Sequence, residues 1–221
     1  MTNKNLIGLV LVLSSVLMIG GNAVDAQQIT LTQGALSYGD GGAFYAQTSE
    51  GEDFTTFCIQ SQVDFYPNET YNYTTSLKDS QGQYLSMGAA YLYSQYIGGE
   101  IKINDSYEAG LLQTAIWSFQ NQVLPSNPAT QTYIGDNPYF EDAENELSGL
   151  SVAFAPSDGK YSVEVINMTD SNGNPAQNQL IDISVAPEPS QIVSMSLLLG
   201  IGGFIYIRAD GLRKFNLKII V

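Results

Sequence analysis

The sequence predicts an α+β fold, a β-sandwich or barrel that carries an inserted helical lobe, followed by a C-terminal transmembrane helix. Three observations predict it. Segments rich in Tyr, Thr and alternating apolar residues lie on both sides of the chain's middle third, which instead shows helical spacing over about residues 80–149. An uncharged run of 17 residues, 191–207, comes just before a basic C-terminus. Strands, then helices, then strands again indicate one domain with a helical insertion.

The first 26 residues have the pattern of a secretory signal. Lys4 precedes an apolar run from Leu6 to Ile19, and a small-residue site ends at Ala26. The run is shorter than the roughly 20 residues that a membrane span needs. We therefore expect cleavage after Ala26, and the alternative is an anchor that stays attached.

The segment that follows, 27–185, is long enough for one domain, and its first part reads as strands. Apolar residues alternate with polar ones, and a glycine-rich turn at 39–42 separates the first two segments. The predicted strands in this part are 28–38, 43–48 and 54–60, and 69–77 is predicted as a further strand or an extended loop.

Three helices follow within the lobe. Leucines and small residues recur at helical spacing over 80–99, where two glycines end the element. The next helix, 104–122, opens with Asp105 and Glu108 in a capping-box arrangement. A short acidic helix then runs over 137–149.

Strands are predicted again over 150–156, 160–168 and 179–187. The segment before the last one contains Asp170, Asn172 and Asn174, spaced like the start of a calcium loop. Its sixth position is Pro175 rather than glycine, and no glutamate stands at the twelfth. We therefore predict a hairpin turn and no metal site.

The charge balance excludes several functions. Between residues 27 and 190 there are 3 basic and 20 acidic residues, a difference of −17, so phosphate-mediated nucleic-acid binding is not expected. The chain contains no histidine, which excludes Ser-His-Asp or Cys-His catalysis and zinc sites built on imidazole. Nucleotide-binding signatures are also absent, so we expect neither a cofactor nor an enzyme.

The C-terminal run predicts a membrane span. At about 1.5 Å per residue, 191–207 gives roughly 25 Å of helix, slightly less than a typical hydrocarbon core. Basic residues follow it, which places the bulk of the chain on the outer side. The alternative is a buried core helix. The basic residues are Arg208, Arg213, Lys214 and Lys218.

The only cysteine, Cys58, lies in the segment FCIQ, and a second segment, LQTAIW at 112–117, follows it in the chain. Together the two segments resemble the paired signatures of thioester domains, which occur in bacterial surface adhesins. The resemblance implies an internal thioester between Cys58 and Gln113. It departs from the usual pattern at Leu112, where the family often has threonine. Taken singly, Cys58 would be read as an inert buried thiol and Gln113 as an ordinary helix residue.

The chemistry explains why such a pair needs rigid elements. A thiolate must attack a side-chain amide, which is a poor electrophile, so placement has to supply much of the driving force. Ala115 is small and would let the helix approach closely. Trp117 lies four residues after Gln113, on the same helix face. We predict that Trp117, together with Ala115 and Phe57, shields the bond from water.

The tail carries a second resemblance. Pro187, Glu188 and Pro189, followed by the apolar run and basic residues, resemble a PEP-CTERM sorting signal. The basic residues here are more widely spread than is usual for such tails. The resemblance implies processing by an exosortase in a Gram-negative bacterium, with a sorting tail over 186–221.

These features predict an exported surface protein that reacts once with a lysine amine on a surface or matrix protein, giving covalent adhesion without turnover. The alternative is a non-covalent structural or glycan-binding biofilm protein in which Cys58 is inert. Tyrosine-rich loops such as 66–73 would suit stacking on sugars.

Overall fold

The computed structural model describes residues 27–38, 41–124 and 136–184. The predicted signal segment, the span 191–207 and the sorting residues Pro187, Glu188 and Pro189 lie outside these ranges. Among the described residues, no helix has both the length and the apolar character needed to cross a bilayer.

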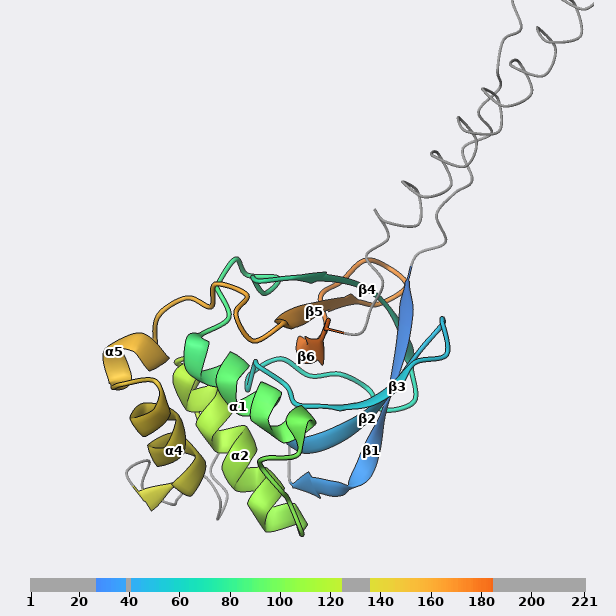
Figure 1. Ribbon diagram of the computed structural model, residues 1–221. Coiled ribbons are helices and arrows are strands. Elements are labelled where there is room, and N and C mark those ends of the chain that lie inside the picture. Colours follow the sequence, from blue (N-terminus) through green and yellow to red (C-terminus); the bar gives the residue numbers. More distant parts are fainter. Residues whose placement is uncertain (1–26, 39–40, 125–135, 185–221) are drawn as a thin grey trace, which may run out of the picture.

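Six antiparallel strands form a single, nearly closed sheet in the order β3-β2-β1-β4-β5-β6 (Figure 1). Of the two architectures expected from the sequence, the barrel is the one observed. The strands are β1 (Gln28–Tyr38), β2 (Gly41–Thr48), β3 (Asp53–Thr56), β4 (Thr70–Ser76), β5 (Val163–Thr169) and β6 (Gln179–Asp182).

The seam of the barrel lies between the two edge strands, β3 and β6. Just past the end of β3, the chain pairs with the start of β6 through a bridge between Cys58 and Gln179. The Leu180 N–H donates to the Phe57 carbonyl at 3.1 Å, and the Ile59 N–H donates to the Asn178 carbonyl at 3.0 Å. These bonds protect two sheet edges that would otherwise be open to other chains. The expectation of one continuous strand over 54–60 is therefore wrong, because the chain leaves β2 after Thr56 and pairs with β6 instead.

The helices lie between β4 and β5 in the chain and pack together on one side of the barrel (Figure 1). Helices α1 and α2 cross closely. A Cβ added at Gly88 would lie 2.6 Å from the Phe119 ring, so only glycine fits at this crossing. The helices are α1 (Met87–Gly98), α2 (Ser106–Phe119), α4 (Pro138–Glu146) and α5 (Leu150–Ala153).

The start of α2 is fixed by side chains that the sequence indicated. The Asp105 carboxylate accepts a hydrogen bond from the Glu108 N–H at 2.9 Å, as an N-cap does. The Glu108 carboxylate accepts from the N–H of Asn104 at 2.7 Å, one residue before the position that a standard capping box uses. Both acidic groups also sit at the positive end of the helix dipole.

The predicted strand over 150–156 is wrong, because α5 occupies its first half. The apolar residues that alternate there, Leu150, Val152 and Phe154, are 40%, 42% and 38% exposed, so they do not form the buried face of a strand. Gly149 adopts a φ of 116°, which breaks the chain direction after α4 and starts a single helical turn. Ala153 is the residue of this turn that reaches the core.

The segment after β5 forms a turn, as predicted. Asp170 accepts hydrogen bonds from the backbone N–H groups of Asn172 and Asn174, both at 2.8 Å, and from the Asn174 side chain. These bonds lower the pKa of Asp170 below its ordinary value, with the Asn174 side chain contributing most. The carboxylate therefore stabilises its own turn.

Buried side chains form two large clusters and one small one. The first lies between the helices and the sheet and includes Phe57, Ala115 and Phe119. The second packs Ile29, Leu31 and other side chains of the sheet together. The small cluster consists of Phe44, Cys58 and Trp117.

Candidate functional site

Cys58 is held in place by the barrel seam. Side chains alternate along an extended chain, so Phe57 and Ile59 enter the helix-facing core while Cys58 points the other way, into the small cluster. The bonds on both sides of it, from Leu180 and Asn178, fix its backbone. Cys58 is fully buried, with 0% of its surface exposed.

Gln113 is presented by the middle of α2. Every residue of this helix from Ala109 to Phe119 is buried, and the helix packs on β1 and β2. Gln113 itself is 1% exposed. A buried primary amide needs partners for its oxygen and its nitrogen, because leaving either one unpaired costs about 1–3 kcal/mol.

Those partners are provided by Cys58. The Cys58 backbone N–H donates to Gln113 Oε1 at 3.2 Å, and Gln113 Nε2 donates to the Cys58 carbonyl at 2.6 Å. The Cys58 thiol also donates to Oε1, with Sγ and Oε1 3.2 Å apart. The amide is therefore locked against the backbone of the residue whose sulfur lies beside it.

This geometry brings a nucleophile next to an electrophilic carbon. The amide carbon Cδ is one C=O bond, about 1.23 Å, from Oε1, so Sγ lies within about 4.4 Å of it. The Cys58 N–H points at the oxygen that would gain negative charge if sulfur attacked Cδ. Its 3.2 Å distance is slightly longer than the roughly 2.7–3.1 Å of an oxyanion-hole donor.

Trp117 covers the pair from the same helix face as Gln113. It is 2% exposed and shares the small cluster with Cys58 and Phe44, while Phe65 and Leu124 pack around them. Its indole N–H is buried and has no hydrogen-bond partner among the described residues. An apolar enclosure of this kind keeps water away from Cys58 and Gln113.

The start of β2 touches the same two side chains. A Cβ added at Gly41 would lie 2.7 Å from Trp117 Cη2 and 2.8 Å from Gln113 Cγ. The backbone at Gly41 can approach α2 this closely only because it carries no side chain. The turn predicted over 39–42 includes Gly41, whereas Gly41 and Gly42 belong to β2 in the structure, and the sequence contains no separate signal for the contact with α2.

A second feature missed from the sequence is a set of buried amides beside Cys58. Gln177 Nε2 donates to the Gln60 carbonyl at 2.7 Å, and the Asn178 N–H donates to Gln60 Oε1 at 3.1 Å. These bonds tie the chain just after Cys58 to the start of β6. Gln60 Nε2 and Gln179 Oε1 are buried without a partner in the described part of the chain.

The structure separates the predicted site residues into two groups. Cys58, Gln113 and Trp117 are brought together in one enclosure. Phe57 and Ala115 are buried in the larger core between helices and sheet, where Phe57 packs edge-on against Tyr96 with ring centroids 5.2 Å apart. Gly41, rather than Ala115, is the small residue at the close approach to Gln113.

The described residues contain no cluster of three or more His, Cys, Asp or Glu side chains that would suit a metal ion. No protein-family model, no curated protein and no solved structure matches this chain.

Proposed function

We propose that this chain is an exported surface protein in which Cys58 and Gln113 form an internal thioester that reacts once with an amine on a partner. The observation that supports the proposal is the two-way pairing of the Gln113 amide with the Cys58 backbone, with Sγ 3.2 Å from Oε1 in a buried enclosure. Holding reacting groups in such contact contributes on the order of 7–11 kcal/mol to a reaction.

Bond formation follows from this arrangement. Cys58 Sγ attacks Gln113 Cδ while the Cys58 N–H stabilises the charge on Oε1. The Cδ–Nε2 bond then breaks, the thiol proton moves to the departing nitrogen, and ammonia is released. The Cys58 carbonyl, which accepts from Nε2 at 2.6 Å, orients the leaving group.

The stored acyl group would then react with a lysine amine of a surface or matrix protein. The amine nitrogen attacks Cδ, the Cδ–Sγ bond breaks, and the amine proton passes to the sulfur. The product is an amide that joins Gln113 to the partner, with Cys58 again a thiol. Because the amide is not reversed, the protein acts as a reagent and not as a turnover catalyst.

We propose that this reaction takes place outside the cell, because the sequence predicts a leader over 1–26 and a PEP-CTERM-like tail over 186–221. We propose a Gram-negative envelope, with the tail anchored in the membrane or released by an exosortase. The acidic body, with its 20 acidic residues against 3 basic ones over 27–190, suits partners that offer lysine.

The intact mass of the mature protein tests the proposal. We expect the wild type to be lighter than its sequence by one ammonia and the Cys58→Ala variant to have its full sequence mass. Methylamine should add to Gln113 in the wild type only, which peptide mapping after digestion would locate.

Either of two results would contradict the covalent mechanism. One is a wild-type mass equal to the sequence mass, and the other is immediate labelling of Cys58 by a thiol reagent in the folded state. The protein would then be assigned to the non-covalent alternative, a structural or glycan-binding matrix protein. The exposed rings of Tyr66 and Tyr84, 68% and 47% exposed, are the surface groups that this alternative would use.

A further inference from the structure

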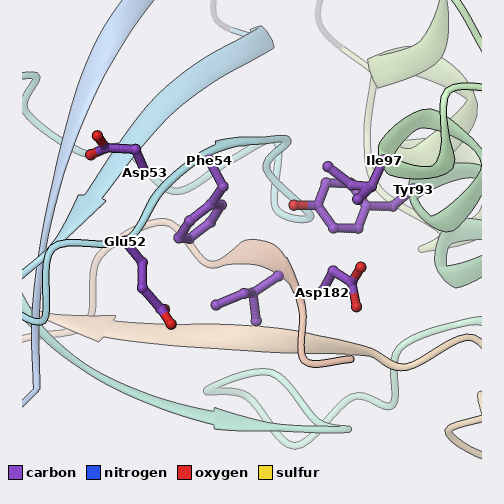
Figure 2. A pocket seen from close by; sticks show the side chains of 7 residues that line it. Glu52, Asp53, Phe54, Tyr93, Ile97 and Asp182 are labelled. Atoms are coloured by element: carbon purple, nitrogen blue, oxygen red, sulfur yellow. The ribbon is translucent and has the colours of Figure 1, made fainter. Parts of the chain in front are cut away.

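A hollow of about 290 Å³ opens where the barrel seam comes apart. The chain after β3 is bonded to β6 through Phe57 and Leu180, but the outer ends of the two strands separate, and α1 borders the gap (Figure 2). The residues that line it are Glu52, Asp53, Phe54, Tyr93, Ile97, Ile181 and Asp182.

The floor and one wall of the hollow are apolar. Phe54 and Ile181 come from the two separating strands, and Ile97 projects from α1 with 38% of its surface exposed. The Tyr93 hydroxyl is already engaged, because it donates to the Thr55 carbonyl at 2.8 Å. The hollow therefore offers mainly hydrocarbon contact to whatever enters it.

The charged groups around this apolar surface are all acidic. Figure 2 shows the Glu52 and Asp182 side chains at opposite ends of the hollow, while the Asp53 carboxylate points away from it. Asp53 instead accepts a hydrogen bond from Gln47 at 3.0 Å. Asp182 accepts one bond, from the Ser184 N–H at 2.7 Å, and within the described residues neither Glu52 nor Asp182 forms an ion pair.

We propose that this hollow binds one basic side chain, lysine or arginine, of a partner polypeptide. Such a side chain combines a long hydrocarbon stem with a terminal cation, so the stem would lie along Phe54 and Ile97 while the cation meets Glu52 or Asp182. A volume of about 290 Å³ is at the lower limit of ligand pockets, roughly 300–1,000 Å³, and suits a single side chain.

A polypeptide fits better than a free amine because of the exposed surface next to the hollow. Ile97 extends the apolar contact beyond the hollow, where residues flanking the basic side chain would pack. The hollow also lies on the same seam as Cys58. Phe54 precedes Cys58 by four residues, about 13 Å of extended chain. The binding proposed here does not require the thioester.

Fluorescence anisotropy with the full chain tests the inference. The probe is a labelled Gly-Ser peptide with one central lysine, and the comparison peptide carries norleucine, which keeps most of the stem and lacks the charge. We expect saturable binding of the lysine peptide at low ionic strength, at least fivefold weaker binding of the norleucine peptide, and binding of an arginine peptide. The double variant Glu52→Gln/Asp182→Asn should weaken lysine-peptide binding at least fivefold.

The matched control is Glu141→Gln/Glu146→Gln, which removes the same charge from exposed positions of α4 and should leave the affinity unchanged. Equal binding of the two peptides, or equal losses in both double variants, would overturn the proposal. Competition by n-butylamine as effective as by the peptide would overturn the assignment to a polypeptide. The Cys58→Ala variant should bind the lysine peptide as the wild type does, although it cannot incorporate methylamine. Failure of peptide binding can therefore be distinguished from failure of the proposed thioester.

Discussion

Gly41 lies against Trp117 so closely that a Cβ at position 41 would be 2.7 Å from Cη2 of the indole ring. The same Cβ would be 2.8 Å from Gln113 Cγ. The limit at this position is space, because Gly41 does not have the positive φ found at Gly42. One missing methyl group therefore sets how closely β2 and α2 approach around the site.

Gly41→Ala is expected to destabilise the protein by about 1–3 kcal/mol, because the added methyl group must displace the indole ring or the Gln113 side chain. Urea unfolding measures the loss. Gly98→Ala is the control, since nothing lies within 4 Å of its Cβ at the end of α1, and it should be neutral or stabilising by up to about 1 kcal/mol. Equal stability of the two variants would contradict the close approach. If the thioester forms, Gly41→Ala should also lower the fraction of molecules that lack ammonia.

Gln113→Glu tests the two-way pairing without relying on the thioester, if it is made in a Cys58→Ala background. In the wild type, Gln113 Nε2 donates to the carbonyl of residue 58 at 2.6 Å. The substitution puts a carboxylate oxygen in place of this nitrogen, and the two oxygens repel each other. We expect a loss of about 1–3 kcal/mol or more in unfolding free energy at neutral pH.

The loss should shrink as the pH falls. Burial raises the pKa of a carboxyl group at this position, and once protonated the group can donate to the same carbonyl. Urea unfolding at neutral and mildly acidic pH provides the comparison. A deficit that does not change with pH would show that the amide nitrogen does not make this bond.

Asp105→Ala should cost about 1 kcal/mol, because it removes the N-cap of the helix that carries Gln113. Asp105→Asn keeps an oxygen that can accept from the Glu108 N–H and should lose much less. Thermal unfolding ranks the two variants, and amide hydrogen exchange at the start of α2 locates the effect. Similar losses in both would mean that the charge of Asp105, rather than its capping bond, stabilises the helix.

The stability of the fold is expected to depend on the ionisation of Tyr73 at alkaline pH. Burial raises the pKa of Tyr73 from 10.0 to about 12, and Glu50 and Glu52 add to the shift. The folded state therefore favours the neutral ring, so the stability gained is fully present below pH 10 and is lost as the pH rises through about 12. Tyrosinate absorbance of the native protein, minus that of Tyr73→Phe, should show a midpoint near pH 12. The variant should also lose less stability over this range, and a midpoint at the ordinary value would contradict the prediction.

Local signals predicted the type and order of the three longer helices, although α1 begins at Met87 rather than at residue 80. The N-cap predicted at Asp105 accepts its hydrogen bond in the structure, and the helical spacing over 80–99 and 104–122 corresponds to α1 and α2. Both helices are buried along continuous runs, 88–93 and 109–119, rather than along one face. The alternating apolar residues over 150–156 led to a wrong strand prediction, because the chain turns at Gly149 and leaves those side chains partly exposed. Alternation records which side chains share a face and does not record whether that face is buried.

The sequence predicted the central pair of the site, Cys58 and Gln113, but not most of the residues that surround this pair. Cys58 and Gln113 could be singled out because two short motifs carry them, and the structure places them in contact. Gly41, Phe44 and Gln177 come from segments outside both motifs, and the pairing of Gln60 with Gln177 and Asn178 could not be seen from the motif that contains it. Their positions follow from how the barrel closes, and that long-range pairing has no local signature.

The pairing of residue 58 with residue 179 also sets an order of events during synthesis. Cys58 and Gln113 are both translated well before Gln179 and Leu180, whose strand braces the chain around the sulfur. A nascent chain that ends at α2 thus holds both partners without the brace that positions one of them. The enclosure is completed only when β6 has been synthesised, so the proposed thioester would form only after Gln179 and Leu180 have joined the barrel.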